Sequence, residues 1–431
     1  MQADYIDTYY ARHMASDERY DALEGHHDAD ICVIGAGLAG LTTALELCRR
    51  GRNVTLLEAK RVAWGASGRN GGFVSPGFAC GQEKIARKVG TDDARALYRL
   101  SMEGVDIVAS NIRALAIDGA DRSDGIISAI RYDGAADLRD HRDQMENDFG
   151  QQLRYMPRDE LRTILLSDKY HQALFSPDAF HFHPLNYAHA LAREITRLGG
   201  RIHEDSAVLA LSTRDGKRHL RTATGTISAQ EIVLASGGYT DHLCPALQRS
   251  FLPIATYVLL TEANAALLDR AIRTTAAIGD DRRAGDYYRR VKGDRLLWGG
   301  RITTRTADPA DLAGLLRQEM VSTYPQLAPL KVDIAWSGLM SYARHLMPQI
   351  GQLAPGLWYC TAFGGHGMNT TAIGGKVIAE GITGESDRYR LFAPFGLAWN
   401  GGPFGRAAVQ LTYWAYQLQD AWRERSSSKT V

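Results

Sequence analysis

A glycine-rich turn between two short apolar runs constrains the fold of this chain more than any other stretch. Ile31–Ile34 is an apolar run typical of a buried parallel strand. Three glycines with G-x-G-x-x-G spacing occupy 35–40, and Leu38–Arg50 has the apolar spacing of a helix. Val54–Leu57 is a second apolar run, and it ends at the acid Glu58. This order predicts a strand, a helix and a second strand around a dinucleotide site.

Each residue of the pattern has a physical role beside a dinucleotide. Gly35 permits the tight turn out of the strand, Gly37 lets a pyrophosphate approach the backbone, and Gly40 lets the helix pack closely on the sheet. The helix N-terminus offers N–H groups and a partial positive charge to the phosphates. Glu58 accepts hydrogen bonds from a ribose diol and would repel a 2′-phosphate. The glycines alone do not distinguish NAD from FAD.

The next stretch, Arg61–Phe73, favours FAD. It reads RVAWGASGRNGGF, with four glycines beside Ser67, Arg69 and Asn70 and with little apolar content. An NAD enzyme normally continues here into another strand–helix unit. A loop this rich in glycine instead indicates backbone that lies against a large flat ligand.

Five motifs together resemble the FAD-dependent oxidoreductases of the D-amino-acid oxidase superfamily. Within it, the chain looks most like the branch that contains gamma-glutamylputrescine oxidoreductase, and the resemblance covers most of residues 5–420. The motifs are GAGLAG at 35–40, the closing Glu58, WGASGRNGG at 64–72, ASGGYT at 235–240 and FGGHGMN at 363–369.

The resemblance implies an α/β fold. A Rossmann-type FAD-binding domain is joined to a second, mainly antiparallel β-sheet substrate domain, as in the glutathione-reductase-like FAD fold. At 431 residues the chain exceeds one ordinary core, which agrees with two connected domains. We expect FAD-binding parts at 29–90, 178–245 and 332–392, substrate parts at 91–177 and 246–331, and a C-terminal docking helix and tail at 393–431. Leu411, Trp414, Leu418 and Ala421 share one face of that helix, which we expect to dock.

The resemblance also implies which residues contact FAD. Relatives that bind the flavin covalently have a cysteine at the position of Gly338, so attachment here is expected to be non-covalent. The expected contacts are Gly35, Gly37, Leu38, Ala39, Gly40, Glu58, Ala59, Lys60, Arg61, Gly65, Ala66, Ser67, Asn70, Gly71, Gly72, Val208, Ala235, Ser236, Gly237, Gly338, Gly364, Gly365, His366, Gly367, Met368 and Asn369.

Flavin oxidation of an amine moves a hydride from the α-carbon to N5 and leaves negative charge near N1 and the C2 carbonyl. A helix N-terminus at Gly365–Asn369 would stabilise that charge. His366 is a candidate catalytic donor, and a purely structural loop histidine is the alternative. The amine must be neutral to react, so an aromatic, mostly apolar pocket suits the reaction. Candidates for the roof of that pocket, with core positions as the alternative, are Tyr257, Tyr287, Tyr288 and Trp298.

Three functions remain open. The first is oxidation of a γ-glutamylated or other aliphatic amine to an imine, which hydrolyses to an aldehyde. The second is oxidation of an amino acid or N-methyl amino acid of the sarcosine, glycine or D-amino-acid type, which an arginine for the carboxylate would favour. Arg289, Arg301 and Arg344 are unassigned candidates. The third is a flavin-bearing subunit without turnover. The sequence does not choose between oxygen and another electron acceptor.

Composition excludes several other classes. The net charge of +1 gives no indication of nucleic-acid binding. The five cysteines form no C-x-x-C pair, which predicts reduced thiols and a cytoplasmic protein. We expect no signal peptide in residues 1–28, no membrane span and no metal site. His181 and His183 lack zinc-ligand spacing, and His183 is interpreted as a histidine hydrogen-bonded at the corner before a helix.

Overall fold

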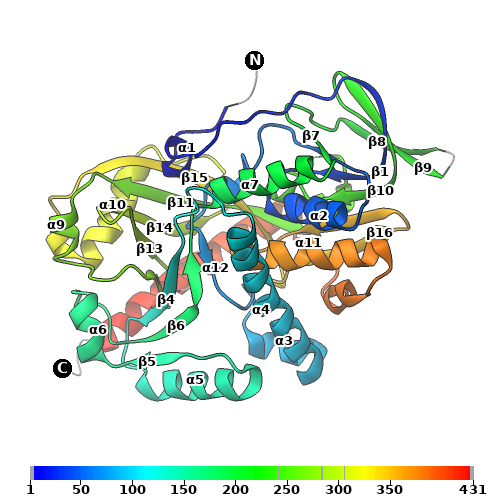
Figure 1. The fold of residues 1–431 in the computed structure, drawn as a ribbon. Coiled ribbons are helices and arrows are strands. Elements are labelled where there is room, and N and C mark those ends of the chain that lie inside the picture. Colours follow the sequence, from blue (N-terminus) through cyan, green and yellow to red (C-terminus); the bar gives the residue numbers. More distant parts are fainter. Residues whose placement is uncertain (1–3, 215, 241, 283–284, 305, 428–431) are drawn as a thin grey trace.

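Two β-sheets lie side by side and share the chain between them (Figure 1). The structure is a computed structural model that describes residues 4–214, 216–240, 242–282, 285–304 and 306–427. The chain runs through the first sheet, the second, the first, the second and the first again. The predicted α/β fold is confirmed.

The first sheet is mainly parallel, as the apolar runs predict. Its strands lie in the order β16-β17-β10-β1-β2-β7, and β17 through β7 are parallel to one another. A β8–β9 hairpin extends it beside β10. The bounds are β1 Gly25–Ile34, β2 Val54–Leu57, β7 Arg201–His203, β8 Ala210–Arg214, β9 Lys217–Arg221, β10 Gly225–Leu234, β16 Gln349–Ala354 and β17 Leu357–Thr361.

The turn from β1 into helix α2 (Leu38–Arg49) depends on its glycines. Gly35 has φ +103°, in the region that side chains rarely adopt. A Cβ on Gly40 would lie 1.9 Å from the Gly35 carbonyl oxygen. No side chain fits there, so the helix starts directly against the end of the strand.

Helices cover the first sheet and bury their apolar faces against it. Helix α2 packs against α11 (Gly367–Thr383) and α7 (Pro184–Arg197), and α11 packs in turn on α4 (Thr91–Ala114) (Figure 1). Their buried faces form one apolar core with β1 and β2. This packing fixes the N-terminal ends of α2 and α11 relative to the sheet.

The second sheet is mainly antiparallel, in the order β15-β11-β14-β13-β12-β4-β6-β3, with β5 beside β6. One face packs with helix α10 (Leu312–Thr323) in a separate core. The bounds are β3 Phe73–Val74, β4 Ser123–Ile130, β5 Arg154–Met156, β6 Gln172–His181, β11 Phe251–Thr261, β12 Ala277–Asp280, β13 Tyr287–Val291, β14 Arg295–Thr303 and β15 Val332–Ala343. The remaining helices apart from the last are α1 Tyr9–Arg12, α3 Gln82–Val89, α5 Ala135–Phe149, α6 Arg158–Ile164, α8 Pro245–Gln248 and α9 Ala265–Leu268.

The predicted domain boundaries stay a prediction. Strand pairing divides the chain somewhat differently from them. β3 lies within the predicted first FAD-binding part and β15 within the third, yet both pair in the second sheet.

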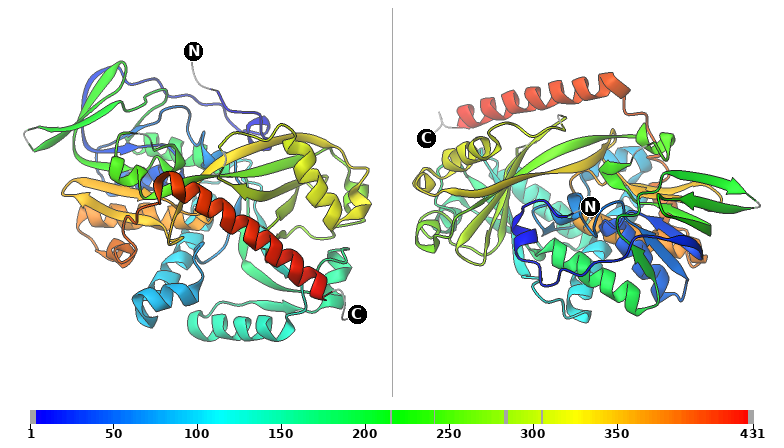
Figure 2. Two further views of the ribbon diagram at one scale, coloured as in Figure 1. Left: turned by 180° about the vertical axis from the view of Figure 1, so that it is seen from behind. Right: turned by 90° about the horizontal axis from the view of Figure 1, so that it is seen from above.

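Helix α12 (Gly402–Ser427) crosses the outside of the molecule, as both views of Figure 2 show. It docks, but the predicted docking face was wrong. Leu411, Trp414 and Leu418 are 61%, 52% and 74% exposed, and the side chain of Ala421 lies outside the described part. Other contacts hold the helix. Tyr413 is buried, the Gln410 side-chain oxygen accepts from Thr303 and Thr304, and Glu424 pairs with Arg131 and Lys169.

Candidate active site

A cavity of about 720 Å³ lies where the two sheets meet. On one side it is lined by the carboxyl ends of β1, β2 and β10 and by the N-terminal ends of α2 and α11. Strands β11, β14 and β15 of the second sheet line the other side. Ligands of open parallel sheets bind at such carboxyl ends, and the volume is in the range of small-molecule sites.

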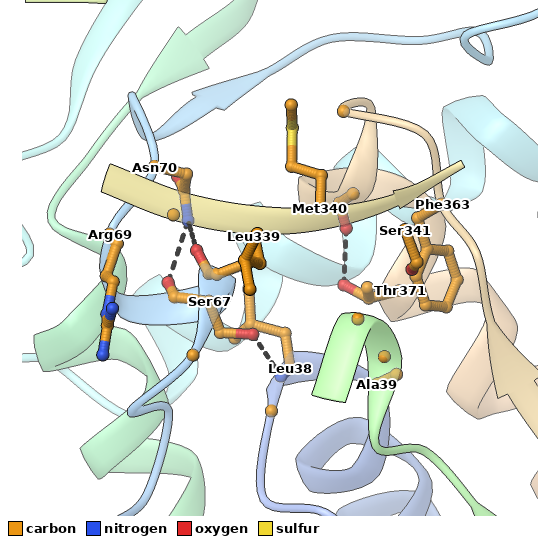
Figure 3. A pocket seen from close by; sticks show the side chains of 18 of the residues that line it. Leu38, Ala39, Ser67, Arg69, Asn70, Leu339, Met340, Ser341, Phe363 and Thr371 are labelled. Atoms are coloured by element: carbon orange, nitrogen blue, oxygen red, sulfur yellow. Dashed lines mark hydrogen bonds between the residues drawn. The ribbon is translucent and has the colours of Figure 1, made fainter. Parts of the chain in front are cut away.

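The N-terminal end of α2 faces this cavity beside the glycine-rich loop. Gly37 caps the helix, and Gly37, Leu38 and Ala39 line the cavity. The Ser67 hydroxyl accepts from the Leu38 N–H at 3.0 Å, which ties the loop to the helix (Figure 3). A Cβ on Gly37 would lie 3.1 Å from the Ser67 oxygen. A side chain here would therefore take the space in which a phosphate approaches the backbone.

Glu58 ends β2 with its carboxylate fixed by the backbone. It accepts from the N–H of Ala36 at 2.7 Å and from that of Lys60 at 2.9 Å. Burial raises the pKa of Glu58, and these two N–H groups oppose the rise. The carboxylate also lines the cavity, so it can accept further hydrogen bonds from a bound diol.

The glycine-rich loop is held from behind by three donors. Trp336 Nε1 donates to the carbonyl of Arg69, the Tyr10 hydroxyl to that of Asn70, and Arg289 Nε to that of Gly71. The distances are 2.9, 2.6 and 2.8 Å. Residues 69–72 also line the cavity, so the loop presents a fixed backbone surface to a ligand.

Within the loop, the Asn70 side chain closes the turn. Its Nδ2 donates to the carbonyls of Ala66 and Ser67 (Figure 3). Its Oδ1 accepts from Gly72 N–H. A Cβ on Gly72, which has φ +78°, would lie 2.3 Å from the Phe182 oxygen. The turn therefore depends on an asparagine side chain that bonds to the local backbone and on a glycine that can adopt a positive φ.

A second helix N-terminus, that of α11, also faces the cavity. His366 caps it, after Gly364 and Gly365 with φ +63° and +78°. A Cβ on Gly365 would lie 2.4 Å from the Tyr342 hydroxyl oxygen and 3.3 Å from the sulfur of Met340. The two glycines therefore let β15 approach the start of the helix.

His366 is a poor proton donor toward the cavity. Its Nε2 lies 3.1 and 3.2 Å from the carbonyls of Ser75 and Pro76, which only accept, so Nε2 carries the hydrogen. Burial lowers the pKa of His366, so the ring is neutral and Nδ1 is an acceptor. The donor role predicted for this side chain is not supported, whereas the backbone N–H groups of the helix remain available.

The second sheet covers the cavity with aromatic and apolar side chains. They include Tyr287 and Tyr342, together with Met340 and Ile302. Burial raises the pKa of Tyr287 to about 12 and that of Tyr342 well above its ordinary value. Both hydroxyls are therefore protonated donors. Among the described residues of this wall, the only charged side chain is that of Arg301.

Most of the predicted cofactor contacts line the cavity, and two do not. Gly40 packs against Gly35 behind the turn. Arg61 is 1% exposed, donates to Asp17 and to the carbonyl of Glu18, and thereby holds the N-terminal arm. The 24 that do line it are Gly35, Gly37, Leu38, Ala39, Glu58, Ala59, Lys60, Gly65, Ala66, Ser67, Asn70, Gly71, Gly72, Val208, Ala235, Ser236, Gly237, Gly338, Gly364, Gly365, His366, Gly367, Met368 and Asn369.

The structure corrects the prediction for three of the four roof aromatics. Tyr287 lines the cavity. Tyr257, Tyr288 and Trp298 lie instead in the core beneath α10, where Tyr288 stacks on Trp298 at 4.2 Å between ring centroids. Successive side chains of a strand point to opposite faces, so Thr256 lines the cavity while Tyr257 faces the core. Tyr257 and Trp298 therefore do not line the cavity.

The candidate arginines separate clearly. Arg301 lines the cavity. Arg289 is buried and donates to the carbonyls of Gly71 and Phe182. Arg344 is exposed outside the cavity. The Nδ1 of His183 accepts from Asn186 N–H at 3.1 Å and caps α7, so its interpretation as a corner histidine is confirmed.

Several lining residues were not predicted. Trp64 and Tyr239 pack in a T-shaped arrangement, with Arg69 over the Trp64 ring. Alternation along β15 could have indicated Met340 and Tyr342, which follow Gly338 at spacings of two. The others are Ile34, Leu57, Phe73, Ser75, Ser206, Gly238, Thr256, Gly285, Gly300, Ile302, Leu339, Ser341, Phe363 and Thr371.

Other site types find no support in the part of the chain that the structure covers. No cluster of three or more His, Cys, Asp or Glu side chains suited to a metal occurs among the described residues. No helix in the described ranges has the length and apolar character to cross a membrane.

The arrangement fits FAD. Gly37 leaves the α2 N-terminus open to a pyrophosphate, and Glu58 has acceptor capacity for a ribose. The fixed backbone of 69–72, the aromatic side chains of the second sheet and the α11 N-terminus all line this one cavity. When FAD is bound, it supplies the hydride-accepting chemistry.

Comparisons with known proteins agree with this geometry. Residues 30–381 match the family described as FAD dependent oxidoreductase. The chain is 33% identical over 392 residues to gamma-glutamylputrescine oxidoreductase of Escherichia coli, covering 90% of this chain and 92% of that protein. It is 31% identical over 395 residues to the Haemophilus influenzae protein named "Probable oxidoreductase OrdL", covering 90% of this chain and 91% of that protein. Glycine oxidase from Geobacillus kaustophilus has a similar fold, with a TM-score of 0.72 at 21% identity over 86% of this chain and 99% of that one. The chain therefore belongs to the FAD-dependent oxidoreductases of the D-amino-acid oxidase family, and FAD is its cofactor.

Proposed function

We propose that this protein oxidises an aliphatic amine of the γ-glutamylputrescine type to an imine, which hydrolyses to an aldehyde. The observation that carries the proposal is the wall beside the α11 N-terminus, where Met340, Tyr342 and Tyr287 provide an apolar, aromatic surface. The similarity to gamma-glutamylputrescine oxidoreductase along nearly the whole chain supports the same substrate class. Non-covalent FAD stays part of the proposal, as does a cytoplasmic location.

The side chains of this wall favour the neutral amine. Among the described residues that line the cavity, Glu58 is the only carboxylate, and it is held at the end of β2 by Ala36 and Lys60. No described acid on the wall can therefore stabilise an ammonium next to Met340 or Tyr342. Loss of the amine proton to solvent is easier in such an environment. Burial against the aromatic side chains then excludes water from the reacting carbon.

The α11 N-terminus stabilises the charge that develops during the reaction. His366 is neutral with Nε2–H on the carbonyls of Ser75 and Pro76, so it fixes the loop and adds no positive charge. The first backbone N–H groups of α11 and the helix dipole provide the stabilisation.

A second candidate, oxidation of an amino acid or N-methyl amino acid, is favoured by one observation. Arg301 lines the cavity and would pair with a carboxylate. The similarity of fold to glycine oxidase leaves this candidate open. A flavin-bearing subunit without turnover is the third candidate, which activity of the purified single chain would exclude.

Anaerobic bleaching of the bound flavin tests the proposal. We expect γ-glutamylputrescine, or a related aliphatic amine, to bleach the flavin rapidly and to yield an aldehyde. We expect sarcosine, glycine, proline and D-alanine to bleach it slowly. Rapid bleaching by these amino acids, with none by aliphatic amines, would replace the first candidate with the second. Reoxidation by oxygen compared with a quinone then identifies the electron acceptor.

A further inference from the structure

Arg301 occupies an unusual position in the wall of the cavity. In the pairing of β11 with β14, Thr256 lies opposite Ile302 and Tyr257 opposite Gly300. Arg301 is therefore the extra residue of a β-bulge. It has φ +49°, in the left-handed region that residues other than glycine rarely adopt. Bulges of this kind re-aim a side chain and are frequent next to active sites.

Among the described residues, the guanidinium of Arg301 has one hydrogen-bonding partner. Its Nη2 donates to Glu319 of α10 at 2.9 Å. Glu319 is shared, since Arg282 Nη1 also approaches it at 3.5 Å. Arg301 Nε is buried and finds no hydrogen-bond acceptor within the described ranges. The side chain as a whole is 36% exposed, so a ligand can reach a guanidinium that has donors to spare in a wall with no described carboxylate, which makes it a site for an anion.

The place of Arg301 in the sheet separates it from the reacting end of the site. Under the proposed function, the amine reacts beside the α11 N-terminus, where Met340 and Tyr342 of β15 contact Gly365. Strand β11 lies between β15 and β14, because Thr256 pairs with Gly338 on one side and Ile302 on the other. Two strand spacings put β14 about 10 Å from β15.

That separation decides which carboxylate fits. In an amino acid, the carboxylate is on the reacting carbon itself, within a single bond. In γ-glutamylputrescine, nine bonds join the reacting carbon to the α-carboxylate carbon, the number in three extended residues, or about 10–11 Å. We propose that Arg301 binds the carboxylate of an amino-acid headgroup at the far end of the amine substrate, and that Glu319 is the positioning residue for its guanidinium. The inference rests on the proposed amine oxidation and narrows its substrates to amines with a distal carboxylate.

The test uses the holoenzyme and a pair of substrates that differ in one group. The first is γ-glutamylputrescine, and the second is the 4-aminobutyryl amide of putrescine, which lacks only the α-carboxylate. Stopped-flow flavin reduction under anaerobic conditions gives the limiting rate and the half-saturating concentration for each. We expect Arg301→Gln to raise the half-saturating concentration about 10- to 150-fold for the first amine, the loss of one charge-assisted hydrogen bond. Its limiting rate, and both constants for the second amine, should stay within about twofold.

Two further variants keep the result interpretable. Arg301→Asn removes the same charge with a residue that adopts left-handed backbone readily, so it replaces Arg301→Gln if that variant does not fold. Glu319→Gln should reproduce part of the loss, for the carboxylate-bearing amine only. Arg344→Gln, at the exposed arginine outside the cavity, is the matched control and should leave both amines unaffected.

The outcomes separate the two proposals. If the wild-type flavin is reduced by both amines and Arg301→Gln weakens both equally or neither, the headgroup site is refuted and the amine oxidation stands. If neither amine reduces the wild-type flavin, the proposed function fails and the inference fails with it.

Discussion

Replacement of Glu58 tests whether the dinucleotide site lies where the geometry indicates. The carboxylate accepts from two backbone N–H groups, at Ala36 and Lys60, while it faces the cavity. Glu58→Ala leaves both N–H groups without their acceptor, and at the fully buried Ala36 this costs about 1–3 kcal/mol. It also removes charge-assisted hydrogen bonds to the ribose, each worth about 1.5–3 kcal/mol. We therefore expect the free energy of unfolding of the apoprotein to fall by about 2 kcal/mol. The affinity for FAD should fall about 10- to 150-fold for each hydrogen bond to the ribose that is lost.

Glu58→Gln separates the two effects. Glutamine keeps the shape of the side chain and one oxygen, so the apoprotein should lose less stability than in Glu58→Ala. Much of the loss in FAD affinity should remain, because the charge is gone. Titration of apoprotein with FAD measures affinity, and thermal unfolding of the apoprotein measures stability. Glu83→Gln, at an exposed glutamate on α3, is the control for a change of charge alone. Unchanged FAD affinity in both Glu58 variants would refute the assignment of Glu58 to the ribose.

Three other predictions follow from the same contacts. Acid precipitation should leave FAD in a yellow supernatant, and a pellet that stays coloured would refute non-covalent attachment. Gly37→Val should nearly abolish FAD binding in the apoprotein titration because its side chain enters the phosphate space, whereas Gly81→Val, where a Cβ meets nothing within 4 Å, should not; equal affinities would place the dinucleotide elsewhere. Burial lowers the pKa of His181 and of His183 to about 3 and that of His189 to about 4, below the unfolded value near 6.5, so their contribution to stability is complete above pH 6.5 and is lost as the pH falls. Each of the three histidines should lower the free energy of unfolding by about 2 kcal/mol at pH 5 relative to pH 7. A denaturant midpoint that is no lower at pH 5 than at pH 7 would contradict the burial argument.

The sequence predicts the parts of this fold that local chemistry determines. The turn at Gly35–Gly40 needs its glycines whatever lies around it, so the end of the first strand, the helix and the second strand were placed to within one residue; β1 itself begins at Gly25, six residues before the predicted start. The glycines at 364 and 365 carry the same kind of signal for α11. Motifs whose backbone must adopt left-handed or closely packed geometry are readable without tertiary contacts.

Side-chain direction depended on tertiary contacts and was not predictable to the same extent. Tyr257 and Trp298 are residue types that often line a cavity, but the register of β11 and β14 points their side chains toward the core beneath α10. Arg301 reaches the cavity because of a one-residue bulge, which no sequence period reveals. Leu411 and Leu418 follow a helical stripe that is usually buried, yet polar contacts hold α12 by another face.

The interleaved strand order has a consequence for how the protein folds. β1 pairs with β10 at a separation of 200 residues, as at Gly25 and Gly225, and β10 pairs with β17, more than 120 residues further along the chain. Closing such loops costs entropy before the contacts form, so folding should be slow, and the first 200 residues alone lack the central partner of β1. Residues from all three passes through this sheet line the cavity, so FAD held there would bind only after they have joined. It should therefore act as a late clamp that lowers the unfolding rate of the whole chain and shields newly made enzyme from proteolysis.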